Sequence, residues 1–261
     1  MREMTDLLDL MARLRDPEHG CPWDRAQTYA TIVPHTIEEA YEVADAIARA
    51  DWAELRGELG DLLFQVVFYA QIAREEGRFD FAAVARGIVE KMTRRHPHVF
   101  GDESYADAAE QTAAWERIKA AEKAARPAGT LDGIPLALPG LTRAVKLQKK
   151  AAKVGFDWGA VEPVLAKIEE EIAEIRHEIA SAAPAERVAD ELGDVLFAIA
   201  NLARHLQIDP EAALRGTNAK FERRFRRIEQ WLAEDGRTPT DSTLAEMDAL
   251  WERAKDRADS R

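Results

Sequence analysis

Apolar residues recur at three- and four-residue spacing along almost the whole chain, and runs of alternating β-branched residues are few. This period matches the α-helix, in which residues three and four apart share a face. The pattern therefore predicts an all-α protein. We expect helices near residues 2–15, 36–50, 52–76, 80–94, 107–125, 140–153, 162–181, 185–207, 210–234 and 243–257. Asp51, Asp80 and Asp209 each precede a helical run and are expected to cap it.

The helical pattern is interrupted between residues 126 and 140, where prolines and glycines gather. Proline lacks a backbone donor and glycine adds backbone freedom, so both residues end helices. The length of 261 residues also suits two ordinary domains. We therefore expect a first helical-bundle domain over residues 1–125, a linker over 126–140 and a second domain over 141–261.

One acidic pattern occurs twice. A Glu-Glu-x-x-Glu stretch at 38–42 recurs at 170–174, and Glu-Leu-Gly-Asp at 58–61 recurs at 191–194. A Lys-x-x-Arg-Arg stretch and a stretch with tryptophan and lysine four residues apart are also repeated, at 91–95 and 220–224 and at 115–119 and 251–255. The shared order and spacing indicate a tandem duplication of one helical unit.

The second acidic helix of each unit combines acids with a broad apolar surface. On a helical wheel of residues 52–76, apolar side chains surround one narrow stripe that carries Glu58 and Asp61. Such a helix is typically enclosed in a bundle, where an ionised carboxylate is unfavourable unless it is paired or binds a metal. On the preceding helix Glu39 and Glu42 share a face. Two such helices packed antiparallel would bring four carboxylates together.

Four converging carboxylates raise one another's pKa values unless cations neutralise them. Ligand sets made only of oxygen favour hard cations, so the expected metal is Mg²⁺, with Mn²⁺ as a substitute. Mg²⁺ held by a few carboxylates keeps room for water and a substrate phosphate, which indicates a phosphoanhydride site. The repeated basic stretch could bind phosphate oxygens. Trp115 and Trp251 could stack on a base or fill a core.

Other interpretations remain open. A single Glu-x-x-Glu pair is usually a solvated helix face, and Glu39 could instead form a capping box with Thr36. A di-iron carboxylate bundle uses Glu-x-x-His on two helices, but Glu174 and His177 have only Asp45 in the corresponding place of the first unit. A non-catalytic helical adaptor with structural metal sites is the main alternative to an enzyme.

Composition limits the partners. The formal net charge of −12 disfavours capture of nucleic acid or of an anionic membrane. The single cysteine, Cys21, excludes an intramolecular disulfide framework and fits a reducing compartment. There is no signal-type apolar segment at the start and no apolar run long enough for a membrane span. A cytoplasmic protein is expected.

At its acidic clusters the chain resembles the MazG family of nucleoside triphosphate pyrophosphohydrolases, within the all-α NTP pyrophosphatase superfamily. The resemblance extends over nearly the whole chain and includes the stretches Cys21-Pro22-Trp23-Asp24, Arg94-Arg95-His96-Pro97-His98, Val154-Gly155-Phe156-Asp157-Trp158 and Lys220-Phe221-Glu222-Arg223-Arg224. It implies Mg²⁺-dependent hydrolysis of nucleoside triphosphates, ATP among them, to monophosphate and pyrophosphate in nucleotide-pool housekeeping. It also implies tandem helical domains that assemble as a homodimer.

The resemblance assigns roles residue by residue. In the second unit the metal ligands, also counted as catalytic, would be Glu171, Glu174, Glu191 and Asp194. The residues around the nucleotide would be Lys167, Glu170, Arg187, Lys220, Arg223, Arg224, Trp251 and Lys255, with Glu170 the catalytic candidate to accept a proton from the attacking water. In the first unit the matching metal ligands would be Glu39, Glu42, Glu58 and Asp61. The matching basic residues behind these acids would be Lys91, Arg94 and Arg95. His35 replaces Lys167 there, which favours the second unit as the main catalytic site.

Overall fold

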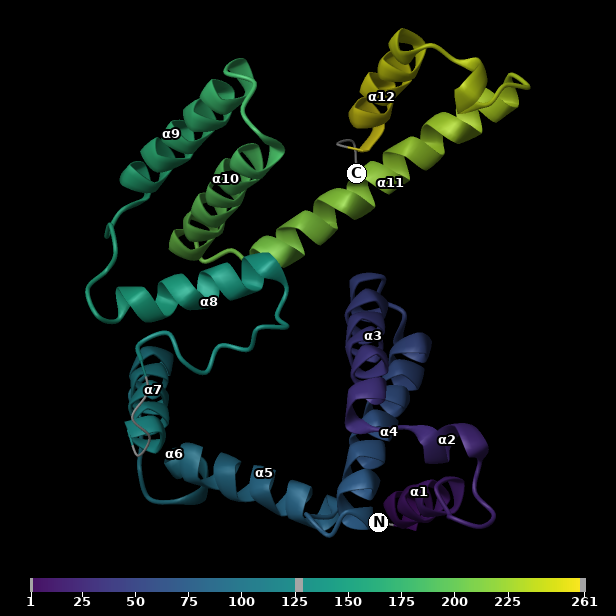
Figure 1. The fold of residues 1–261 in the computed structure, drawn as a ribbon, viewed down its shortest axis with the longest axis vertical. Coiled ribbons are helices and arrows are strands. Elements are labelled where there is room, and N and C mark those ends of the chain that lie inside the picture. Colours follow the sequence, from purple (N-terminus) through teal and green to yellow (C-terminus); the bar gives the residue numbers. More distant parts are fainter. Residues whose placement is uncertain (1, 125–128, 259–261) are drawn as a thin grey trace. The chain divides into compact units, whose positions relative to one another are not determined.

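The computed structural model describes residues 2–124 and 129–258, and over these ranges the chain forms helices and no strand (Figure 1). It divides into two compact units, Met1–Arg126 and Pro127–Arg261. The all-α class is confirmed. The predicted domain limits at 125 and 126 and the first linker residues lie outside the described residues, so the exact limits stay predictions.

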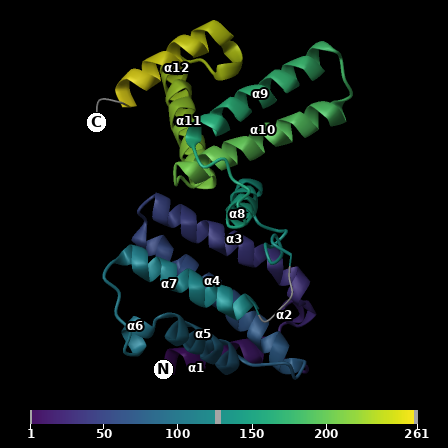
Figure 2. The ribbon, with the colours of Figure 1, turned by 90° about the vertical axis from the view of Figure 1, so that its left-hand side faces the viewer.

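The first unit is organised around a helical hairpin. Its helices are α1 (Arg2–Leu14), α2 (Pro22–Ala26), α3 (Tyr29–Ala48), α4 (Trp52–Glu75), α5 (Phe81–Arg95), α6 (Pro97–Phe100) and α7 (Ala108–Ala124). The two long helices α3 and α4 lie side by side and antiparallel (Figures 1 and 2). Helix α1 packs on α4, and the buried core there consists of Met11, Ile32, Val67, Phe68 and Ile72. The hairpin is thus anchored at the end where α4 finishes.

The second unit repeats the hairpin. Its elements are α8 (Gly140–Ala152), α9 (Val161–Ala180), α10 (Ala185–His205), α11 (Pro210–Glu234), the 3₁₀ turn η1 (Pro239–Asp241) and α12 (Leu244–Ala258). Helices α9 and α10 lie side by side, α8 packs on α10, and α12 folds back on α11 (Figure 2). Arg204 donates to both carboxylate oxygens of Asp157, which fastens the loop before α9 to the end of α10.

Helix starts follow the predicted caps with one correction. Asp51, Asp80 and Asp209 each accept a backbone N–H group in the first turn of the next helix, as expected. Helix α3, however, begins at Tyr29 and not near residue 36. Thr28 and Thr31 form its capping box, and the helix continues through Pro34. The alternative cap at Thr36 is therefore wrong.

Thr36 lies inside α3, where its hydroxyl donates to the carbonyl of Ile32 and bonds the hydroxyl of Tyr69 on α4. The sequence predicted a helix start after Pro34 because proline supplies no N–H group to a helix and is unfavourable in its interior. The short helices α2 and α6 and the turn η1 carry too few residues to show a period and were not predicted.

Each hairpin leaves an apolar strip uncovered. On α4, Val67 and Phe68 are buried, while Leu59 remains 51 % exposed. On α10, Val195 is buried and Leu192 remains 52 % exposed. The expectation that such a helix is enclosed on all sides is therefore not met within one unit. None of the helices in the described ranges is both long and apolar enough to cross a membrane.

Candidate metal and nucleotide site

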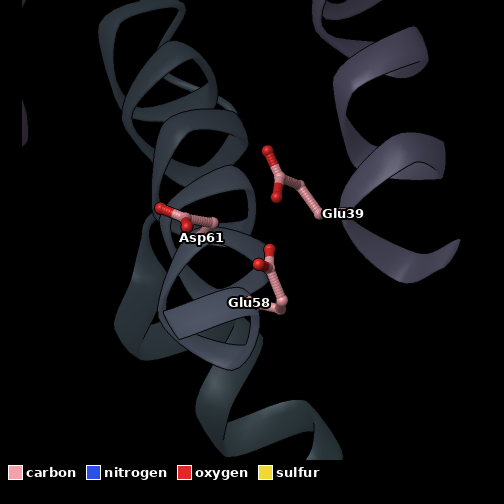
Figure 3. A group of neighbouring side chains, drawn as sticks. All are labelled: Glu39, Glu58 and Asp61. Atoms are coloured by element: carbon pink, nitrogen blue, oxygen red, sulfur yellow. The ribbon is translucent and has the colours of Figure 1, made fainter. Parts of the chain in front are cut away.

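The first acidic cluster spans the α3–α4 hairpin. Glu39 reaches from α3 toward Glu58 and Asp61 on α4, and one carboxylate oxygen from each residue lies within 4.8 Å of the others (Figure 3). The hairpin brings them together because Glu39 lies on the inner face of α3, while Glu58 and Asp61 are three residues apart on α4. Gln65, one turn after Asp61, is buried and donates to Glu39 at 3.5 Å.

Burial and repulsion between neighbouring carboxylates both raise pKa values in this cluster. Burial raises the pKa of Glu39, and Asp61 and then Glu42 raise it further. Burial also raises the pKa of Glu58, followed by the charge of Glu42. Glu42 therefore acts on the same cluster although it is outside the group of three that share 4.8 Å. A cation placed among these carboxylates would relieve the repulsion.

The second acidic cluster has the same form on α9 and α10. Glu171, Glu191 and Asp194 each offer a carboxylate oxygen within 4.8 Å of the others. Burial, and then the charges of Glu171 and Glu191, raise the pKa of Glu174. Glu174 is therefore close enough to this group to feel its charge. Each cluster thus brings together three of the four acids that the repeat predicted to converge, and Glu42 and Glu174 lie outside these groups of three. Whether they bind metal stays a prediction.

Glu171 provides the strongest indication of a missing ligand. Its side chain is only 6 % exposed, and its Oε2 atom is buried without a hydrogen-bond partner. Its other oxygen pairs with Lys167 at 2.6 Å. Buried carboxylate oxygens normally have a partner, and a divalent cation is a partner that such an oxygen suits. The donor set therefore fits a hard cation.

Two of the predicted nucleotide-binding cations lie beside the second cluster. Lys167 bridges Glu170, at 2.8 Å, and Glu171, and these two hydrogen bonds raise the pKa of the lysine. Arg187 lies 3.0 Å from Glu178 and 3.6 Å from Glu191. Positive charge next to the acids is the arrangement that a polyphosphate ligand requires in addition to metal.

The remaining predicted nucleotide-binding residues form a separate group on α11 and α12: Lys220, Arg223, Arg224, Trp251 and Lys255. The guanidinium of Arg224 lies 5.6 Å from the ring centre of Trp251, and Lys255 pairs with Glu252. Within the described part of this unit, no hydrogen bond or ion pair joins this group to the acids of α9 and α10. Within these described residues, the α11–α12 group is therefore not bonded to the second acidic cluster.

The basic stretch of the first unit has a structural partner. Arg94 and Arg95 both pair with Glu122 of α7, at 2.7 and 2.6 Å. These arginines lower the pKa of Glu122 to about 2. Arg95 also lies over the ring of Trp115. Glu122 was not singled out from the sequence, because the repeat gives no signal for it.

The di-iron alternative finds no support in the geometry of the described residues. Both groups that could hold a metal consist of carboxylates alone, and His177 belongs to neither. His35 pairs with Glu38 at 3.7 Å and lies edge-on to the ring of Trp23. It therefore does not reproduce the contact that Lys167 makes with the cluster acid of the second unit.

A duplicated helical hairpin with converging carboxylates and nearby lysine and arginine is compatible with a site for a divalent cation and a phosphoanhydride. Comparison with known proteins agrees. The family model of the MazG nucleotide pyrophosphohydrolase domain matches residues 27–100 and 160–228, once over each hairpin. The chain therefore belongs to the MazG family and is an enzyme of the pyrophosphohydrolase class.

Individual relatives extend over nearly the whole chain. The nucleoside triphosphate pyrophosphohydrolase of Escherichia coli (strain K12) is 52% identical over 257 residues, which cover 98% of each chain. The nucleoside triphosphate pyrophosphohydrolase/pyrophosphatase MazG of Thermotoga maritima is 43% identical and covers 96% of this chain and 94% of its own. A crystal structure of a mazG-related protein from Thermotoga maritima aligns with 44% of this chain and 98% of its own, at 29% identity and a TM-score of 0.39. The predicted family and the duplicated all-α architecture are confirmed.

Proposed function

We propose that this enzyme hydrolyses nucleoside triphosphates to nucleoside monophosphate and pyrophosphate in a reaction that depends on Mg²⁺, with Mn²⁺ as a substitute. The observation that carries the proposal is the buried, unpartnered Oε2 atom of Glu171 in a cluster of carboxylates that also includes Lys167. Two relatives that match nearly the whole chain are named nucleoside triphosphate pyrophosphohydrolases, which supports nucleoside triphosphates as the substrate class. Nucleotide-pool housekeeping is the role that follows from this reaction.

The second unit would hold the cation through Glu171, Glu174, Glu191 and Asp194. When bound, a divalent cation supplies positive charge against the triphosphate and activates water for attack on the α-phosphorus. The α9–α10 hairpin would position these acids, because its two helices pack side by side. The first unit offers Glu39, Glu42, Glu58 and Asp61 in the corresponding places.

Lys167 and Arg187 would bind phosphate oxygens. Both of them pair with acids of the cluster. Lys167 and Arg187 would turn from these acids to the phosphate oxygens of the triphosphate if the charge of the acids were neutralised. Glu170 is exposed and pairs with Lys167, and it would accept the proton of the attacking water.

The α11–α12 group and the uncovered apolar strips together support a homodimer. In the described part of the second unit, no hydrogen bond or ion pair joins the α11–α12 group to the acids of α9 and α10. Helix α10 exposes Leu192 beside the cluster acid Glu191. A second copy that covers the apolar strip could bring its own basic group to the site. We do not expect nucleic acid or a membrane as a partner, because the net charge is −12. The expected location is the cytoplasm.

Product analysis tests the reaction. The protein would be incubated with a panel of nucleoside triphosphates, with Mg²⁺, with Mn²⁺ and with a chelator, and the products separated by chromatography. Monophosphate and pyrophosphate should form only with metal. Diphosphate and orthophosphate as primary products would place the attack at the γ-phosphorus and contradict the proposal. A folded protein that binds metal but hydrolyses no triphosphate would instead support the adaptor alternative.

A further inference from the structure

The hairpin that carries each acidic cluster is closed by an ion pair, and the polarity of this pair is opposite in the two units. In the first unit Arg49, at the end of α3, pairs with Glu54 in the first turn of α4. In the second unit Glu178, near the end of α9, pairs with Arg187 in the first turn of α10. The positive partner is thus on the first helix in one unit and on the second helix in the other.

The second partner of each pair occupies an equivalent place. Glu54 precedes the cluster acid Glu58 by four residues, and Arg187 precedes Glu191 by four residues. Residues four apart on a helix are neighbours on one face. The two hairpins therefore place opposite charges at the same position beside the proposed metal ligand.

In the second unit Glu178 anchors the arginine. The side chain of Glu178 is 16 % exposed, whereas that of Arg187 is 58 % exposed. Arg187 is 3.0 Å from Glu178 and only 3.6 Å from Glu191. A guanidinium has five N–H donors, so one bond to Glu178 leaves others that can reach a phosphate group. Glu178 thus holds the guanidinium of Arg187 at the edge of the cluster and leaves some of its N–H donors unoccupied.

In the first unit the arginine pairs with acids outside the cluster. Arg49 donates to Glu54 and, at 2.8 Å, to Asp45, and it faces Asp51 at 3.8 Å. Glu54 lies one turn before the cluster acid Glu58 on the same face of α4. Among the described residues, no lysine or arginine forms an ion pair with the four cluster acids of this unit. Its cluster has additional negative charge where the second unit has positive charge.

We infer that the polarity of the hairpin ion pair determines which cluster accepts the triphosphate: Glu178 positions Arg187 for the phosphates in the second unit, and Glu54 repels them in the first. This inference rests on the proposed function, since it concerns the same substrate. Glu178 acts as a positioning residue through Arg187. A role limited to joining the two helices would depend on the presence of the pair, and not on its direction.

Exchange of the two partners separates these roles. The double variant Glu178→Arg/Arg187→Glu keeps an ion pair across the α9–α10 hairpin and gives it the polarity of the first unit. The probe is the α,β-methylene analogue of the best triphosphate substrate, or of ATP if none is hydrolysed, titrated by calorimetry with Mg²⁺ present. We expect the melting temperature to stay close to that of the wild type and the analogue to bind about tenfold more weakly.

Two further variants keep the test valid if the exchanged pair does not fold. Arg187→Gln removes only the exposed cation and should also weaken binding, whereas Glu178→Gln leaves the cation unanchored and should raise KM more than it lowers kcat. The matched control is Arg49→Glu/Glu54→Arg in the first unit, which should not weaken binding. All variants are compared by circular dichroism and by melting temperature.

The outcomes distinguish this inference from the proposed function. If the folded Glu178→Arg/Arg187→Glu and Arg187→Gln proteins bound the analogue with wild-type affinity, the inference would be overturned. The proposed hydrolysis of triphosphates would not be affected by that result. A loss of affinity confined to the first-unit control would reverse the assignment of the two units and overturn the inference too. A wild-type protein that neither binds the analogue nor hydrolyses any triphosphate would refute the inference together with the proposed function.

Discussion

Replacement of Glu171 by glutamine tests the central claim that this carboxylate serves a cation. Glutamine keeps the volume of the side chain and removes its charge. Lys167 loses its 2.6 Å partner but retains Glu170 at 2.8 Å, so no lysine charge is left without a carboxylate. Loss of one charged hydrogen bond destabilises a protein by about 1.5–3 kcal/mol, and relief of repulsion with Glu174 offsets part of this. The Glu171→Gln protein should therefore fold.

The effect on function should be much larger than the effect on stability. Glu171 is one of three acids whose oxygens lie within 4.8 Å of one another, and its Oε2 atom has no other partner. Loss of a group that merely orients a metal ligand weakens metal affinity about 10- to 100-fold, so loss of a ligand should cost at least as much. We expect pyrophosphate release to fall at least about tenfold and to need more Mg²⁺ for half-maximal rate.

The matched control is Glu39→Gln, which changes the corresponding acid of the first unit. Pyrophosphate release would be measured over a series of Mg²⁺ concentrations, with circular dichroism and light scattering to establish folding and assembly. Glu39→Gln should leave much of the turnover. If Glu39→Gln abolished hydrolysis while Glu171→Gln left it intact, the assignment of the catalytic unit would be reversed. Equal partial losses would mean two working sites.

Three further predictions concern assembly, pH and the α5–α7 contact. Light scattering at micromolar concentration should give the mass of a dimer, and a cooperatively folded monomer would contradict the proposed assembly. In chelator, the melting temperature should rise as pH falls from 7 toward 5, because the raised pKa values of Glu39 and Glu58 mean that the folded state binds more protons than the unfolded state. The rise should be smaller in the presence of Mg²⁺ and in the Glu39→Gln/Glu58→Gln variant. If the dependence of the melting temperature on pH were the same in these two cases, the explanation by Glu39 and Glu58 would be refuted. Glu122→Gln frees Arg94 and Arg95 and should speed amide exchange in α7; wild-type exchange would argue against the contact.

The helical framework could be predicted because local chemistry and tertiary packing agree. Asp51 and Asp80 lie where a cap was expected, and each accepts the N–H group three residues later. The start of α3 was missed because Pro34 suggests a helix beginning and Thr28 gives a weaker signal than an aspartate. A capping box formed by Thr28 with Thr31, rather than with a glutamate, does not match the usual sequence pattern.

The acidic part of the site could also be predicted, because positions three apart on a helix share a face in any environment. The basic part could be predicted only in part. Lys167 lies one turn before Glu171 and so contacts it within one helix. Lys220 and Trp251 belong to other helices, whose approach to the acids depends on packing between elements that the sequence period does not encode. The contact between Glu178 and Arg187 was missed for the same reason, since it crosses the hairpin turn.

The duplication makes each unit a physical control for the other. The same hairpin brings three carboxylate oxygens within 4.8 Å in both units, so this geometry follows from the shared backbone and acids. What differs is the charge around it: Lys167 and Arg187 contact the second cluster, whereas His35 and Glu54 occupy the corresponding positions in the first. A divalent cation needs the carboxylates alone, but a triphosphate needs cations as well. The inequality of the units should therefore appear in triphosphate binding more strongly than in metal binding.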